Sequence, residues 1–297
     1  MKAATMRRFS AVLMLAVALM LAYPTVGTIW ENQQAREAAA QQTQQAETLK
    51  RQQPEKVAQA LLDAHAYNQS LTGVPLADPY STPNEHDAAS WDTYLHQLAD
   101  TGDGVMGRIR VPGVGIDLPI HHGTSDEAMR TGAGHLYGTA LPVGDTSARP
   151  VLSTHTGLRN ATLFDRLTDV KIGDPFYVDV YGETLAYEVT SIDVITPDQI
   201  EALAPVPGKD LVTLMTCTPY AVNSHRLLVT GERIPYNSET DPTATTTTPD
   251  PIEFILNAIT PLPWYMRLMG AASLGAFIAG IVMAVPKKKR PRPQGDV

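Results

Sequence analysis

The single cysteine of this 297-residue chain, Cys217, is the strongest nucleophile that the sequence offers. It follows residues 211–216, a run rich in apolar and β-branched side chains, and precedes Thr218-Pro219, so we expect it at a strand end beside a loop. A lone thiol makes no intramolecular disulfide and supplies too few soft ligands for a structural zinc or iron–sulfur site. Most free cysteines are buried and inert, so a catalytic role requires activating groups nearby.

Two basic residues are candidates for those groups. Arg226 lies nine residues after Cys217 and immediately before another apolar run, so a hairpin would return its guanidinium close to the thiol. His155 follows the strand-like run 151–154, and a histidine there can act as general acid or base because its pKa lies near neutral pH. A structural histidine remains the alternative reading, and His225 is a weaker candidate for the same catalytic role.

The adjacent pair His121 and His122 is the other cluster of potential ligands. Neighbouring residues on a strand point to opposite faces, which argues against one shared metal ion. No compact run of acidic residues resembles an EF-hand calcium loop. We therefore expect neither a metal site nor a cofactor.

Short strands must position these side chains. Apolar and β-branched runs separated by Gly and Pro turn signals predict strands, whereas short helices are expected only around 126–130 and 163–167. This pattern predicts a mainly β fold, a closed β-barrel with short helices. The expected strands are 105–111, 116–121, 151–154, 176–180, 185–192, 211–216 and 227–234.

Two charge-free intervals flank the β-rich region, one of 22 residues between Arg8 and Glu31 and one of 19 between Arg267 and Lys287. Each is long enough to cross a bilayer. Basic residues flank the outer end of each interval, so the positive-inside rule predicts that both termini are cytoplasmic. A cleaved signal peptide is the alternative for the first interval, but no clear cleavage site follows it.

Residues 30–263 would then lie outside the cell membrane. They contain 14 basic and 30 acidic residues, a net charge of −16, and the whole chain has a net charge of −8 and an isoelectric point near 5.4. This balance gives no electrostatic reason to bind nucleic acid.

Composition divides the chain further. Residues 31–62 are rich in Ala, Gln and Glu and predict a helical stalk interrupted at Pro54, whereas the Thr- and Pro-rich segment 238–251 predicts an extended linker. The expected division is a cytoplasmic N-terminus (1–8), a transmembrane anchor (9–29), a helical stalk (30–55), an N-terminal helix and lid region (56–100), the barrel (101–236), a linker (237–263), a transmembrane helix (264–286) and a basic cytoplasmic tail (287–297).

The catalytic candidates resemble those of the sortase family. The sequence TLMTC at 213–217, the following Arg226 and the preceding His155 match the TLxTC strand, arginine and histidine of that family. Further stretches resemble the class C, pilin-polymerising branch, and together they cover most of residues 56–236. They are AYNQSL (66–71), GVMGRIRVPGVGIDLPIHHG (104–123), GAGHLYGTALPVG (132–144) and LFDRLTDVKIGDPFYV (163–178).

Class C sortases carry a membrane anchor at each end and an N-terminal lid with an Asp-Pro-aromatic motif. Asp78-Pro79-Tyr80 resembles that lid, with tyrosine where many members have tryptophan or phenylalanine. The resemblance implies that Asp78 pairs with Arg226 while the ring of Tyr80 covers the sulfur of Cys217. By itself this tripeptide most often indicates only a turn.

The resemblance implies a cysteine transpeptidase that acts on the LPxTG-like sorting signal of a pilin. Cys217 would attack the Thr-Gly bond to form a thioester, and a lysine amine of another pilin subunit would then resolve it as an isopeptide bond. His155 would serve as acid and base, and Arg226 would stabilise the oxyanion or hold the signal.

Three other readings remain open. One is a housekeeping sortase that attaches surface proteins to cell-wall peptide, and another is a cysteine hydrolase. The third is a wall-anchored structural protein, because the last apolar span is followed by a basic tail. That reading requires LPxTG before the span, where this chain has TPLPW at 260–264.

Overall fold

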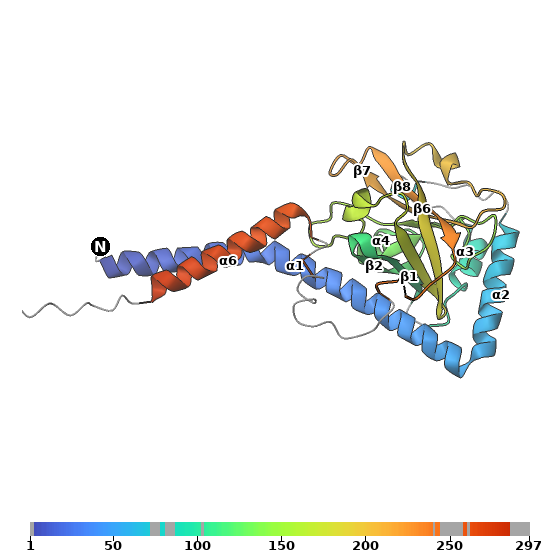
Figure 1. Cartoon of the computed structure of the whole chain (residues 1–297), viewed down its shortest axis with the longest axis horizontal. Helices are drawn as coiled ribbons and strands as arrows, with labels where there is room; N and C mark the ends of the chain where they lie inside the picture. The colour runs from blue at the N-terminus through green and yellow to red at the C-terminus, as the bar shows by residue number, and fades with distance from the viewer. Residues whose placement is uncertain are drawn as a thin grey trace, which may run out of the picture. The chain divides into compact units, whose positions relative to one another are not determined.

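The computed structural model describes residues 3–71, 78–80, 87–101, 104–239, 241–243, 258–259 and 262–285. Eight strands form a closed barrel in the order β1-β2-β3-β4-β7-β8-β6-β5, which confirms the predicted fold class (Figure 1). The strands are β1 Val105–Val111, β2 Ile116–His122, β3 Ala133–His135, β4 Val151–Ser153, β5 Pro175–Val180, β6 Glu183–Ile195, β7 Leu211–Thr218 and β8 His225–Ile234.

The α-helices are α1 Ala3–Gln52, α2 Pro54–Ser70, α3 Ala88–Leu95, α4 Asp126–Thr131 and α6 Trp264–Ala284, and the 3-10 helices are η1 Pro112–Val114, η2 Asp165–Asp169 and η3 Ile200–Leu203. The chain divides into two compact units, one of residues 29–261 and one of residues 1–28 with 262–297.

Strand β7, which carries the cysteine, is buried on both faces. Val212 and Leu214 point into the main barrel core, whereas Met215 packs in a second cluster that includes Tyr80 and Leu203. Burial on both sides explains why the strand reads as a continuous apolar run rather than as an alternating one. The cysteine therefore lies on a strand whose residues are almost all buried.

The structure adds elements that the sequence analysis missed. Strand β3 pairs in parallel with β2. It consists of only three residues, Ala-Gly-His, which form no recognisable apolar run in the sequence. Helix α3 was also missed. Strand β6 extends to Ile195 because a register shift between Val189 and Ser191 lets it continue along β8. The second predicted short helix is the 3-10 helix η2, displaced toward the C-terminus by two residues.

Helix α1 ends at Gln52 and α2 begins at Pro54, as the proline predicts. Between residues 29 and 52, α1 packs on the barrel: Ala39 and Ala46 are fully buried, and Lys50 Nζ donates to the Gly182 carbonyl at 3.1 Å. The small side chains of this predicted stalk thus allow the helix to approach the barrel closely.

The second unit pairs the apolar start of α1 with α6, and both helices are long and apolar enough to span a membrane. They run antiparallel: Ser273 Oγ donates to the Ala18 carbonyl at 2.8 Å, and Gly280 lies against Leu15. A Cβ at Gly280 would lie 3.0 Å from Leu15 Cγ, so the glycine permits the close approach.

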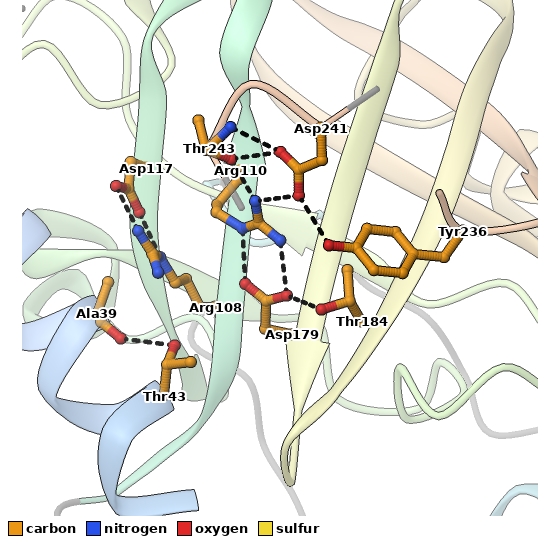
Figure 2. Close-up of polar contacts among 10 residues, drawn as sticks. All are labelled: Ala39, Thr43, Arg108, Arg110, Asp117, Asp179, Thr184, Tyr236, Asp241 and Thr243. Carbon is orange, nitrogen blue, oxygen red and sulfur yellow. Dashed lines mark hydrogen bonds and ion pairs between the residues drawn. The ribbon is translucent and has the colours of Figure 1, made fainter. Parts of the chain in front are cut away.

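A buried ion cluster joins the segment that follows β8 to strands β1 and β5 (Figure 2). Arg110 makes two hydrogen bonds to Asp179, at 2.7 and 2.8 Å, and a third at 2.7 Å to Asp241. The Arg110 side chain is only 5% exposed and that of Asp241 is fully buried. The hydroxyl of Tyr236 also donates to Asp241. Residue 241 is thereby fixed to the barrel wall.

Replacing Arg110 by alanine leaves two buried carboxylates without a counter-charge, and we expect the barrel unit to lose about 3–5 kcal/mol of unfolding free energy. Arg108, two residues earlier on β1, pairs with the more exposed Asp117, so Arg108→Ala should cost about 0–1 kcal/mol. Urea unfolding of both variants tests the difference. Equal losses would show that the buried cluster adds no special stability.

Candidate active site

The three catalytic candidates lie at one end of three adjacent strands. Strands β4 and β7 are parallel with Ser153 opposite Met215, so His155 and Cys217 follow at equivalent positions two residues later. In the β7–β8 hairpin, Cys217 is the direct cross-strand partner of Arg226. Strand register alone therefore brings together the thiol, the imidazole and the guanidinium that the sequence singled out.

Asp78 forms a buried, bidentate ion pair with Arg226. The Nε–Oδ1 and Nη2–Oδ2 distances are 2.6 and 2.7 Å, and both side chains are about 5% exposed. The remaining terminal nitrogen of Arg226 donates to the carbonyls of Asn223 and His225. Pro79 lies in the turn that follows Asp78. The guanidinium is thus fully engaged while Asp78 is in place.

The ring of Tyr80 lies between the two basic candidates. Its centroid is 4.8 Å from the guanidinium carbon of Arg226 and 5.9 Å from the ring of His155, which it meets edge-on. Its hydroxyl donates to the carbonyl of Thr154 at 2.7 Å and lies 2.7 Å from Ser153 Oγ. Tyr80 is therefore bonded to the strand end that carries His155 and stacked on Arg226.

Burial holds the thiol of Cys217 in its neutral form. Burial raises the pKa of Cys217, the charge of Asp78 raises it further, and Arg226 lowers it. Cys217 is 7% exposed, and it in turn helps raise the pKa of Tyr80. In this arrangement the thiol of Cys217 is both buried and poorly ionised.

His155 has a carboxylate partner that the sequence analysis missed. Its Nε2 lies 3.3 Å from Asp126 Oδ1, and Asp126 is also paired with Arg130 at 2.6 Å. Burial lowers the pKa of His155, Asp126 raises it and Arg130 lowers it, for a net downward shift. His155 is therefore neutral at neutral pH and able to accept a proton. In the sequence, Asp126 and Arg130 showed only the four-residue spacing of a solvated helix pair.

The other histidines have different partners. His225, the weaker catalytic candidate, is the first residue of β8 and contacts Ser224 through Nδ1. The Nε2 of His122 lies 2.6 Å from the carbonyl oxygen of Gln97. Across the described ranges, no group of three or more His, Cys, Asp or Glu side chains is arranged to hold a metal ion. His155 differs from His225 in having a carboxylate, Asp126, within 3.3 Å of its ring.

Removing Asp126 should lower the pKa of His155, and removing Arg130 should raise it, because these two charges act on the imidazole in opposite directions. An NMR pH titration of Asp126→Ala and Arg130→Ala, with His155→Gln to assign the signal, measures both shifts. Glu127→Ala, an exposed acid on the same helix, is the matched control. Shifts of the same sign in both variants would contradict the assignment.

Comparisons with known proteins agree with this geometry. A profile of the Sortase domain matches residues 109–234. Sortase C-1 from Actinomyces oris is 49% identical, with a TM-score of 0.58, and the match covers 61% of this chain and 99% of that one. A pilus-related Sortase C of Group B Streptococcus is 42% identical, with a TM-score of 0.58 and coverages of 65% and 97%.

A curated relative, Sortase A of Bacillus anthracis, is 29% identical over 130 residues, or 44% of this chain. The match spans 60% of the length of that relative. The sortase C structures, by contrast, are covered almost completely. The chain therefore belongs to the sortase family, and its structural neighbours place it with the class C branch.

Proposed function

We propose that this protein is a membrane-anchored cysteine transpeptidase that polymerises pilins. It cleaves an LPxTG-like sorting signal between Thr and Gly and joins the acyl group to a lysine amine of another pilin subunit. The observation that carries the proposal is the meeting of Cys217, Arg226 and His155 at one end of strands β4, β7 and β8. Asp78-Pro79-Tyr80, bonded to this site, supports the lidded, pilin-specific type.

The first half-reaction forms a thioester. Neutral His155 takes the proton of the Cys217 thiol as the sulfur attacks the threonine carbonyl, and Arg226 stabilises the oxyanion that develops. His155 then gives the proton to the departing glycine amine as the C–N bond breaks. In the second half-reaction the lysine amine attacks the thioester, His155 takes its proton, and the thiol is regenerated as the isopeptide bond forms.

Asp78 must release Arg226 before this chemistry begins. The guanidinium is bonded on one edge to Asp78 and through its remaining terminal nitrogen to backbone carbonyls, so an oxyanion or sorting signal competes directly with Asp78 for it. The lid residues thus describe a resting state, and substrate binding requires that they leave.

The two apolar helices support anchoring at both ends. Their hydropathy and their antiparallel packing against one another fit a pair of transmembrane helices, with both termini cytoplasmic and the catalytic unit outside. Retention of the first helix as an anchor is part of this proposal, because α6 uses it as a packing partner.

Intact-mass spectrometry tests the proposal. The full chain carrying Asp78→Ala, in detergent, is incubated with an LPxTG-type peptide, and Asp78→Ala with Cys217→Ala is the control. We expect a mass increase equal to the acyl portion of the peptide, absent from the control. Adding a lysine-containing pilin peptide or a cell-wall peptide then shows which amine removes the adduct. Removal by the cell-wall peptide alone would favour a housekeeping sortase, and no adduct on an alkylatable Cys217 would overturn the proposal.

A further inference from the structure

The chain that follows His155 is folded back by one carboxylate. Asp165 Oδ1 accepts hydrogen bonds from the backbone N–H of Gly157 at 2.6 Å and from Thr156 Oγ1 at 3.0 Å. Next to it, the N–H of Phe164 donates to the carbonyl of His155 at 3.3 Å. Asp165 thereby closes the loop that begins at the catalytic histidine.

The residue before His155 is held by several independent bonds. The carbonyl of Thr154 accepts from Thr216 Oγ1 at 2.8 Å, its hydroxyl donates to the Met129 carbonyl at 2.5 Å, and its N–H donates to the Met215 carbonyl. On this upstream side, removing any one side chain would leave the other hydrogen bonds to Thr154 in place. On the downstream side, both bonds to residues 156 and 157 end on the same oxygen.

Gly157 adopts a left-handed conformation beside the loop that follows Cys217. Its φ of +79° lies in the left-handed region, and a Cβ there would lie 3.5 Å from the ring of Tyr220, which belongs to the loop after Cys217. The turn after His155 therefore rests on the loop of the nucleophile on one side and on Asp165 on the other. A shift of this turn moves the imidazole relative to the thiol.

We propose that Asp165 is a positioning residue for catalysis, which fixes the imidazole of His155 by anchoring Thr156 and Gly157. This inference rests on the proposed function in one respect only: that His155 is the acid and base of acyl transfer. Burial raises the pKa of Asp165 to about 6, and the two hydrogen bonds oppose that rise. Above this pH the carboxylate is charged and its hydrogen bonds are of the stronger, charge-assisted kind.

A set of three variants of the full chain tests the proposal. Asp165→Ala removes both hydrogen bonds, and Asp165→Asn keeps an oxygen that can accept them. Asp169→Ala is the matched control, because it removes an exposed acid of the same 3-10 helix that pairs with the neighbouring Arg166. The Asp78→Ala background keeps the site open in all of them.

We expect Asp165→Ala to lower the kcat of thioester formation about 100-fold, the loss typical of a misplacement near 1 Å. KM and the alkylation rate of Cys217 should stay within about twofold, because the nucleophile and its pocket are unchanged. Asp165→Asn should restore most of kcat, and Asp169→Ala should match the parent. Equal kcat in all variants, or a loss of kcat accompanied by a loss of thermal stability and a changed alkylation rate, would overturn the positioning role.

A second readout separates this proposal from the proposed function. The NMR signal of the His155 imidazole should shift or broaden in Asp165→Ala and remain like the parent in Asp165→Asn and Asp169→Ala. This measurement needs no sorting signal. If the parent forms no thioester, the proposed function fails while the signal still tests the anchoring of His155, and an unchanged signal in Asp165→Ala would refute it.

Discussion

Replacing Asp78 by alanine will raise the alkylation rate of Cys217 by about 100-fold or more. The ion pair with Arg226 is bidentate and almost fully buried, and breaking such a pair by removing one partner costs about 3–5 kcal/mol. That penalty falls on the closed arrangement of the lid, where Arg226 would remain buried without its counter-charge. At about 1.4 kcal/mol per factor of ten, it increases the open population by two or more orders of magnitude.

The loss of Asp78 also acts on the thiol directly. Its charge and the burial of the site both raise the pKa of Cys217, so removing the one and relaxing the other increases the thiolate fraction at a given pH. Alkylation with a small reagent, followed by intact mass, measures the rate. Asp117→Ala removes an aspartate from another bidentate arginine pair and should leave the rate unchanged. A rate in Asp78→Ala equal to that control would mean that Asp78-Pro79-Tyr80 does not shield the site.

Replacing Arg226 by alanine should change alkylation and catalysis in opposite directions. Asp78 would be left buried without a partner and Tyr80 without the cation on which it stacks, so the lid opens. We expect this exposure to outweigh the loss of the Arg226 charge, which lowers the pKa of Cys217, so that alkylation of Cys217 accelerates. Thioester formation should nevertheless fall about 100- to 1,000-fold, because the transition state loses its charged donor. General unfolding would also expose the buried thiol and abolish catalysis, so an unchanged melting temperature is the readout that separates the two explanations.

Arg233→Ala provides the matched control for the second prediction. Arg233 lies on the same strand, stacks on Tyr187 and pairs with Asp210, away from the lid. We expect neither rate to change in this variant. Arg226→Lys keeps the charge but not the bidentate geometry, so it should recover part of the thioester rate. If Arg226→Ala lowered the melting temperature strongly, or left thioester formation unchanged, Arg226 would hold the fold rather than the substrate.

The sequence predicted the strands that carry the thiol and the guanidinium because β7 and β8 each contain a short run of apolar and β-branched residues. The nine-residue spacing from Cys217 to Arg226 then allowed little besides a hairpin, and the structure places the two residues opposite one another. The position of His155 depended on a pairing between β4 and β7 that no local pattern encodes. The prediction that His155 lies near Cys217 therefore depended on the resemblance to the sortase family.

Other parts of the site could not be predicted from local sequence. Asp126 reaches His155 from helix α4, and Asp165 reaches Gly157 across a loop of seven residues, and in both cases only the tertiary arrangement brings the groups together. The sequence around each acid is typical of a solvated helix end. Strand β3 was missed for the same reason, since its pairing is set by the strands on either side.

The contacts of Tyr80 and Asp78 give the lid the properties of a tethered competitor. Because it is attached to the same chain, its effective concentration at the site is independent of dilution and can reach the millimolar range. The apparent dissociation constant of any free peptide is raised by the reciprocal of the open fraction of the lid. A sorting signal that is confined near the enzyme also has a high local concentration and can compete with the lid, whereas a dilute peptide in solution cannot. The ion pair between Asp78 and Arg226 would thus raise the local concentration of sorting signal that is needed for it to bind beside the thiol.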